Sequence, residues 1–370
     1  MKQGKTLQEL GRELQRQRNN RQDFIADTRS LAMETTAYGS TLNMMIDGKT
    51  YGYQVSDIAH QQIASRLNIP YRYYQKMQTE TPELLDANVN TWLNKNSERR
   101  MIRVLDGKVR AFLSDRYRRL DNLELCAAVL PVIQEMKGAN IESCEITPTC
   151  MYLKVVNKKL KAEVTVGDVV QAGFVISNSE VGLGSMRVEP LIFRLACKNG
   201  LICKDATQKK YHVGRQVNVS EDTAYELYSD ETQAQDDKAF FMKVQDVVRS
   251  AVDETRFMLT VEKMRETKEV PLGKDPIKAV EVLADKFQLT ENERGDVLRR
   301  LFMSGDNSRY GLINAVTSAS KLAKTYDRAT ELEKIGGEIL ALPIPRNLLP
   351  PSADEALEMA LMYEHTMQIA

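Results

Sequence analysis

Apolar residues recur at helical spacing through the first quarter of the chain. Residues 6–30 place Leu7, Leu10 and Leu14 on one helical face and arginines elsewhere. This spacing predicts an amphipathic helix that lies on a neighbouring domain or subunit. Three further helical patterns follow, in IAHQQIASRL, YRYYQKM and LLDANVNTWL. We therefore expect residues 1–98 to form an amino-terminal helical region.

Near residue 100 the period changes from helical to alternating. RMIRVLDGKVRAFL has two short alternating runs around Asp106 and Gly107, a dipeptide preferred in tight turns, and so predicts a β-hairpin. A helix over LELCAAVLPVIQEM and strands in IESCEIT, MYLKVVN, DVVQAGFVISNS and MRVEPLIFRLAC follow. Because strands and helices do not alternate regularly, residues 99–220 favour an α+β core with an antiparallel or mixed sheet and packed helices.

Beyond residue 220 the pattern becomes helical again. The stretch 221–237 is acidic, and apolar side chains then recur at helical spacing as far as Met258, which predicts one long helix. PLGKDP at 271–276 interrupts the pattern, three more helices follow, and PIPRNLLPP at 343–351 predicts a loop or tether before a last short helix. Residues 221–370 are expected to be a helical carboxyl-terminal region.

Charge and composition exclude several classes of protein. The 370 residues carry 51 basic and 51 acidic side chains, so attraction to nucleic acid must come from local asymmetry of charge. No apolar stretch approaches a membrane span or the core of a signal peptide, which predicts a cytoplasmic protein without a membrane partner. The five cysteines lack paired short spacings and are expected to be reduced thiols.

Basic residues gather in one short segment. From Arg99 to Arg119 there are eight basic residues and two acidic ones. Arginine makes bidentate contacts with phosphate oxygens and stacks on bases, and a tyrosine supplies another stacking face. The alternative is a solvated face with internal salt bridges to nearby aspartates. The residues predicted to contact nucleic acid are Arg103, Lys108, Arg110, Arg116, Tyr117, Arg118, Arg119, Arg194 and Lys198.

Residues 58–77 have the outline of a helix-turn-helix. Asn68 can adopt the left-handed conformation that the turn needs, and the apolar side chain of Ile69 is expected to pack between the two helices. Many helical hairpins share this outline, so the alternative is a pair of helices that merely pack, with Tyr71, Tyr73 and Tyr74 half-buried.

Other motifs carry no chemistry. The glycines of NSEVGLGSM at 178–186 match neither phosphate-binding pattern, and a turn between strands explains them better. Cys197 and Cys203 lack the second close pair or the nearby histidines of a zinc site. No catalytic residue, cofactor or metal is predicted.

Three stretches resemble a known family: KVRAFLSDRYRRLDN at 108–122, GFVISNSEVGLGSMRVEPLIFRLACKNGLI at 173–202 and YHVGRQ at 211–216. They are similar to the phage- and plasmid-borne "phage/plasmid-like protein" group, catalogued only as a domain of unknown function. The resemblance covers most of residues 5–340. Genes of this sort often accompany replication, recombination and single-strand-binding functions, which favours a nucleic-acid role by association.

The most specific function that the resemblance implies is ATP-independent strand annealing, by a protein similar in kind to the ring-forming phage recombinases. Its partners would be single-stranded DNA or RNA and further copies of the chain, in a homo-oligomer such as a ring. Two alternatives stay open. One is a host-interaction (anti-defence) protein that uses protein contacts or mimics nucleic acid through its acidic stretch, and the other is a helix-turn-helix duplex DNA binder.

Overall fold

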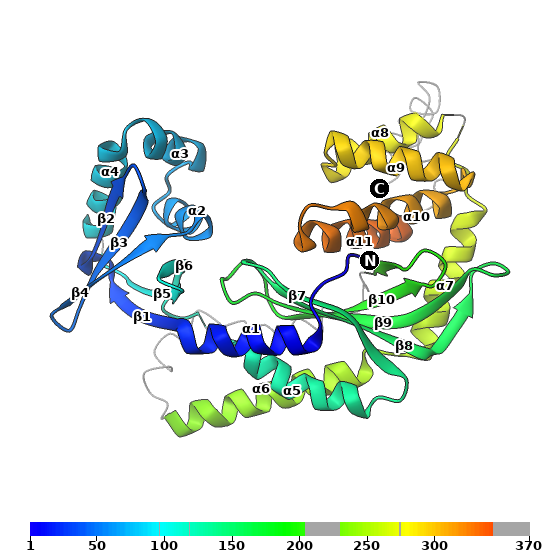
Figure 1. The fold of residues 1–370 in the computed structure, drawn as a ribbon, viewed down its shortest axis with the longest axis horizontal. Helices are drawn as coiled ribbons and strands as arrows, with labels where there is room; N and C mark the ends of the chain where they lie inside the picture. Colours follow the sequence, from blue (N-terminus) through cyan, green and yellow to red (C-terminus); the bar gives the residue numbers. More distant parts are fainter. Residues whose placement is uncertain (96, 118, 204–229, 274, 343–370) are drawn as a thin grey trace, which may run out of the picture.

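The computed structural model describes residues 1–95, 97–117, 119–203, 230–273 and 275–342 (Figure 1). It contains two sheets, one of six strands and one of five, and each sheet has its own covering of helices. We call residues 21–114 the amino-terminal lobe, and the remaining described residues the carboxyl-terminal lobe. The expected α+β class, with an amino-terminal helix and a helical carboxyl-terminal region, is confirmed.

The amino-terminal lobe is built on the six-stranded sheet, in the order β1-β5-β6-β4-β3-β2. β4 and β6 pair in parallel, and the other neighbours are antiparallel. Asp106 and Gly107 both have positive φ, at 52° and 73°, and make the predicted hairpin turn. The strands are β1 (Arg21–Asp27), β2 (Leu31–Thr36), β3 (Gly39–Ile46), β4 (Lys49–Val55), β5 (Arg99–Leu105) and β6 (Lys108–Ser114).

The prediction of a wholly helical region over residues 1–98 is wrong for residues 21–55, which form four strands. Helix α1 (Leu7–Asn20) ends where β1 begins. β2 and β3 bury alternate residues, Leu31 with Met33 and Leu42 with Met44, as strands with one covered face do. Threonines and other polar residues separate these apolar positions, which therefore do not recur at the three- and four-residue spacing of a helix.

Three helices pack against this sheet and enclose its core: α2 (Asp57–Arg66), α3 (Tyr71–Glu80) and α4 (Pro82–Lys95). The turn between α2 and α3 has Asn68 at φ 56°, as predicted. Helix α4 also closes the edge of the sheet, because the Asn90 side chain accepts from Met33 N at 2.7 Å and donates to Met33 O at 2.9 Å. The exposed backbone of an edge strand is thereby satisfied without another strand.

The carboxyl-terminal lobe is built on a five-stranded antiparallel sheet, in the order β11-β10-β9-β8-β7. The four strands predicted in the middle of the chain are confirmed as β7 to β10, and the glycines of 178–186 connect β9 to β10. The strands are β7 (Ala139–Ile146), β8 (Met151–Glu163), β9 (Val169–Asn178), β10 (Arg187–Arg194) and β11 (Asn199–Ile202).

Helices cover both faces of this sheet (Figure 1). Helix α1 and two helices from separate parts of the chain, α5 (Asn122–Glu135) and α6 (Asp230–Ser250), pack on one face. The other face carries α7 (Glu254–Lys268), α10 (Arg309–Ala319) and α11 (Tyr326–Ala341), with α8 (Pro276–Phe287) and α9 (Glu291–Ser304) outside them. Because both faces are covered, β9 is buried at every residue from Val170 to Asn178.

The long helix predicted to reach Met258 is two helices. Residues 251–253 separate α6 from α7, and the Asp253 side chain caps α7 by accepting from Arg256 N at 2.7 Å. The predicted tether at 343–351 lies outside the described residues, as does the larger part of the acidic stretch, residues 221–229.

A fully buried ion pair fixes α11 to the sheet. Lys154 Nζ on β8 lies 2.7 Å from Glu333 Oε2 on α11, and both side chains are inaccessible to solvent. The Lys154 ammonium also lies 4.6 Å from the centre of the Tyr326 ring. Such a pair holds one alignment of helix and strand, since a shift would leave two unpaired charges in the interior.

Candidate nucleic-acid interface

The arginine-rich segment lies where the two lobes meet. Residues 115–121 lead from β6 to α5, and the 179–186 loop of the carboxyl-terminal lobe returns to touch the amino-terminal lobe. Gln62 bridges the two lobes, because its Nε2 donates to Val181 O at 2.7 Å and its Oε1 accepts from Phe112 N at 2.7 Å. The segment therefore makes part of the junction.

Arg103 is enclosed in this junction. Its Nε lies 3.0 Å from Asp23 Oδ1, its Nη2 2.8 Å from Asp121 Oδ1, and its Nη1 donates to Glu180 O at 2.9 Å. The side chain is 0% exposed. The prediction that Arg103 contacts phosphate is wrong for this fold, because two carboxylates of the same chain surround the guanidinium and exclude solvent.

Arg110 and Tyr117 also bind the 179–186 loop. Arg110 Nη2 lies 2.8 Å from Glu180 Oε2, and the other oxygen of that carboxylate accepts from Asn122 N at 2.6 Å. The Tyr117 hydroxyl donates to Ser179 O at 2.9 Å, and burial raises the pKa of Tyr117. Of these two side chains predicted to contact nucleic acid, Arg110 joins the two lobes, and Tyr117 fixes the segment after β6 to the 179–186 loop.

The other predicted residues of this segment are more open. Lys108 and Arg116 are exposed at opposite ends of β6, and the exposed Arg119 has its Nη1 3.5 Å from Asp23 Oδ2. Arg118 lies outside the described residues. The structure therefore divides the predicted arginine cluster between the interior and the surface.

Arg194 and Lys198 lie in the carboxyl-terminal lobe, away from this segment. Arg194 forms a two-point ion pair with Asp168, at 2.5 and 2.8 Å, and the same carboxylate accepts from the Tyr310 hydroxyl at 2.6 Å. Lys198 is exposed in the turn between β10 and β11. These two residues do not join the others in one surface.

A cleft of about 450 Å³ lies on the amino-terminal lobe instead, between the α2–α3 turn, α4 and the ends of β5 and β6. Tyr73 on α3 and Trp92 on α4 line it, and they are 49% and 43% exposed. Asn68 and Asn88 add polar groups to the lining. Phe112 also lines the cleft and belongs to the apolar core of the lobe. A cleft with half-exposed aromatic rings suits a planar ligand, because each ring offers a face for stacking.

Cations stand around the cleft. Arg66 Nε lies 2.9 Å from Glu98 Oε2, and this hydrogen bond lowers the pKa of Glu98 below its ordinary value. Lys95 Nζ lies 4.6 Å from the centre of the Trp92 ring, a cation–π contact that places the ammonium over one face of the ring. Glu98 also lines the cleft and balances the charge of Arg66, so the cleft combines aromatic faces with the positive charge of Lys95.

Arg116 belongs to this end of the sheet. β5 and β6 pair with Arg100 opposite Ser114, so Arg116, two residues beyond Ser114, follows β6 where β5 starts at Arg99. Arg99 and Arg116 are both exposed. One of the predicted phosphate ligands therefore lies at the cleft's end of the sheet.

The helix-turn-helix outline forms a wall of the cleft. Tyr74 is fully buried and Tyr71 half-buried, whereas Tyr73, expected to be half-buried, is exposed in the cleft. The Tyr74 hydroxyl lies 2.8 Å from His60 Nδ1, and burial lowers the pKa of His60 to about 4. The two helices therefore pack through a neutral imidazole and a buried phenol.

Trp92 is absent from the sequence-based set of site residues. The sequence holds a signal for it, since Trp92 is the single tryptophan of the chain. It lies beside the stripe of Leu85, Val89 and Leu93 that α4 buries. A large aromatic residue at the border of an apolar stripe is a candidate for a surface contact.

Within the described parts of the chain, no group of three or more His, Cys, Asp or Glu side chains is placed to hold a metal ion. None of the helices described there is long and apolar enough to cross a membrane.

Comparison with known protein families identifies the family of this chain. The model of the family described as "Domain of unknown function (DUF932)" matches residues 111–337. These residues cover the lobe junction and most of the carboxyl-terminal lobe, while the cleft lies almost wholly before them. No curated protein and no solved structure matches the chain.

Proposed function

The chain belongs to the family described as a domain of unknown function (DUF932), and we propose that this member binds single-stranded nucleic acid in the cleft of its amino-terminal lobe. One observation carries the proposal: Trp92 and Tyr73 are both half-exposed in one cleft of about 450 Å³. Its volume is within the range of small-ligand sites, about 300–1,000 Å³.

Stacking supplies the main binding energy in this proposal. A base stacked on an aromatic side chain contributes about 1–3 kcal/mol, and every base has a face to offer, so binding tolerates many sequences. An unpaired base can enter the cleft, whereas a base inside a duplex is already stacked on its neighbours. This reasoning favours single strands over duplexes.

The positive charges supply a smaller, salt-dependent part. Arg66 and Lys95 flank the aromatic faces, and Arg116 follows at the same end of the sheet. Arg66 is already paired with Glu98, so if Lys95 and Arg116 neutralise two phosphates, the logarithm of affinity should fall with the logarithm of salt at a slope of about 1.4, since each phosphate on a single strand contributes about 0.7.

Fluorescence anisotropy with a labelled oligothymidylate tests this proposal. Trp92→Ala and Tyr73→Ala should each weaken binding by roughly 5- to 150-fold, which corresponds to the loss of one stacking contact. Phe302→Ala is the matched control, because Phe302 is 54% exposed on α9 in the other lobe. Absence of binding at low salt, or equal affinity in all three variants, would refute the proposal.

Strand annealing remains a prediction that depends on this binding. Annealing without nucleotide hydrolysis, by a homo-oligomer such as a ring, can be followed by energy transfer between two labelled complementary strands. Trp92→Ala should slow it in proportion to the lost affinity. Preference for one duplex over single strands would instead support the helix-turn-helix alternative.

A further inference from the structure

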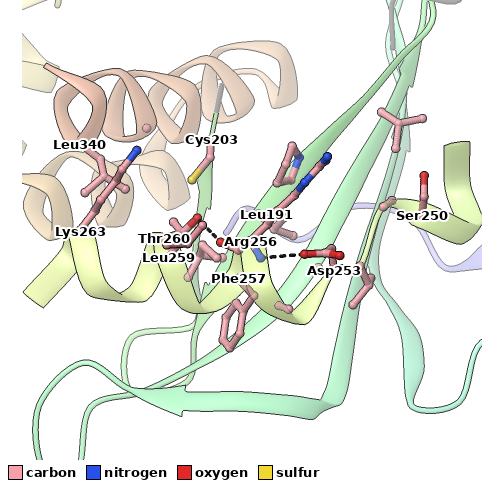
Figure 2. Close-up of a pocket in the computed structure, with 18 of the residues that line it drawn as sticks. Leu191, Cys203, Ser250, Asp253, Arg256, Phe257, Leu259, Thr260, Lys263 and Leu340 are labelled. Carbon is pink, nitrogen blue, oxygen red and sulfur yellow. Dashed lines mark hydrogen bonds between the residues drawn. The ribbon is translucent and has the colours of Figure 1, made fainter. Parts of the chain in front are cut away.

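A second cavity, of about 350 Å³, opens on the surface of the carboxyl-terminal lobe (Figure 2). It is bounded by β9 and β10 of the sheet, by α7, by α11 and by the turn between α6 and α7. This site is separate from the cleft of the amino-terminal lobe, and the proposed nucleic-acid binding does not use it.

The walls of the cavity are mostly apolar. Leu191, Phe257 and Leu340 supply large side chains from three different elements. Two small residues, Ala172 on β9 and Gly337 on α11, also belong to the lining. Apolar walls of this kind favour an aliphatic or aromatic group, since filling them removes apolar surface from water.

Two cations on one helix give the cavity a positive side. Arg256 and Lys263 both line it from α7, and a separation of seven residues places them on the same helical face, two turns apart. Thr260 lies between them, with its hydroxyl donating to Arg256 O at 2.9 Å. The one acid of the lining, Asp253, caps α7 and keeps its charge, so the lining carries two positive charges and one negative charge (Figure 2). The charge therefore suits an anionic ligand.

We propose that this cavity binds a medium-chain fatty carboxylate, with its aliphatic tail between Leu191, Phe257 and Leu340 and its head group toward Lys263. An amphipathic ligand with a single negative charge satisfies both observations, the apolar walls and the cationic helix face. A nucleotide fits less well, because its polar sugar and base would lose hydrogen bonds to water against these walls.

Cys203 provides a reporter for the proposed site. It lines the cavity (Figure 2), and its backbone N–H donates to Pro190 O of β10 at 3.0 Å. Cys197 is equally half-buried but lies in the β10–β11 turn, apart from the lining residues. Occupancy of the cavity should slow alkylation of Cys203 and leave Cys197 unchanged, so the second thiol is an internal control.

The experiment measures maleimide labelling of the two cysteines in the full chain by peptide mass spectrometry. Decanoate should slow labelling of Cys203 at least several-fold, and decylamine, with the same tail and the opposite charge, should not. Lys263→Met should abolish most of the protection. Lys278→Met, which removes an exposed lysine from α8, should keep it.

Three results would overturn the inference. The first is unchanged Cys203 labelling at decanoate concentrations below its micelle formation. The second is equal protection by decylamine, which would mean that the site does not select charge. The third is equal protection in the Lys263→Met and Lys278→Met variants, because the head group would then not be near Lys263.

Discussion

Arg103 Nη2 lies 2.8 Å from Asp121 Oδ1, and this contact joins β5 of the amino-terminal lobe to the start of α5 in the carboxyl-terminal lobe. Asp23, opposite Arg103 in the β1–β5 pairing, holds the other side of the guanidinium. A positive charge that the sequence places in a basic cluster is thus neutralised within the protein. The Arg103 charge therefore contributes to the packing of the two lobes against each other.

Loss of the Arg103 charge should therefore affect folding strongly. Arg103→Met leaves Asp23 and Asp121 without their buried partner, and we expect a loss of about 3–5 kcal/mol in the free energy of unfolding. Lys108→Met, on an exposed lysine of the same hairpin, should change it by less than about 0.5 kcal/mol. Urea unfolding followed by circular dichroism measures both. A loss below about 1 kcal/mol for Arg103→Met would contradict the structural role.

The predictable parts of the fold have local causes. The β5–β6 hairpin follows from Asp106 and Gly107, which take the positive φ angles of a two-residue turn. β8 and β9 are found because burial on both faces leaves long apolar runs. β2 and β3 alternate buried and open positions as strands covered on one face do, so the sequence holds a signal for them, whereas β1 has no such alternation and overlaps the stretch predicted to be an amphipathic helix.

The site is less predictable, because exposure depends on distant partners. Asp23 and Arg103 are 80 residues apart, and the β1–β5 register brings them together. Glu180 reaches Arg110 from a loop of the other lobe. A basic cluster in a sequence therefore shows where positive charge is abundant, while the tertiary structure decides which guanidinium groups face outward.

The buried pair of Lys154 and Glu333 should show strong coupling. Lys154→Met leaves the Glu333 carboxylate unpaired in the interior, Glu333→Met leaves the Lys154 ammonium unpaired, and each single variant should cost about 3–5 kcal/mol. In the double variant Lys154→Met/Glu333→Met neither charge remains. We expect its loss to be smaller than the sum of the two single losses by at least about 1 kcal/mol. Strict additivity in urea unfolding would show that the pair contributes no mutual interaction.

Acid should destabilise the amino-terminal lobe through His60. Burial lowers its folded-state pKa to about 4, below the ordinary 6.5, so the unfolded chain binds more protons at intermediate pH. Stability is therefore complete above the unfolded pKa and falls as the pH drops toward the folded one, by about 2 kcal/mol between roughly pH 7 and pH 5.

His60→Gln lacks the titrating group and provides the comparison. Its free energy of unfolding, measured in urea across the same pH range, should fall less steeply than that of the unchanged chain by about 2 kcal/mol. Parallel pH profiles would show that His60 is not buried as a neutral group.

Two glycines of the helical region should respond oppositely to alanine. A Cβ on Gly337 of α11 would lie 1.9 Å from Ile202 O, so Gly337→Ala must push the helix away from β11 and should cost about 2–3 kcal/mol. A Cβ on Gly295 of α9 meets nothing within 4 Å. Gly295→Ala should therefore stabilise the protein by about 0.5–1 kcal/mol. Thermal melting of both variants checks the opposite signs, and a stabilised Gly337→Ala variant would contradict the close packing of α11 on β11.

The most direct test of nucleic-acid binding in the cleft uses the chain's single tryptophan, Trp92, as the reporter. Titration with unlabelled oligothymidylate at low salt should quench Trp92 emission to a plateau, with the same half-saturation as the anisotropy of a labelled strand, and added salt should restore the emission. Unchanged Trp92 emission at oligonucleotide concentrations that saturate the anisotropy signal would contradict the account, because the strand would then bind elsewhere on the protein.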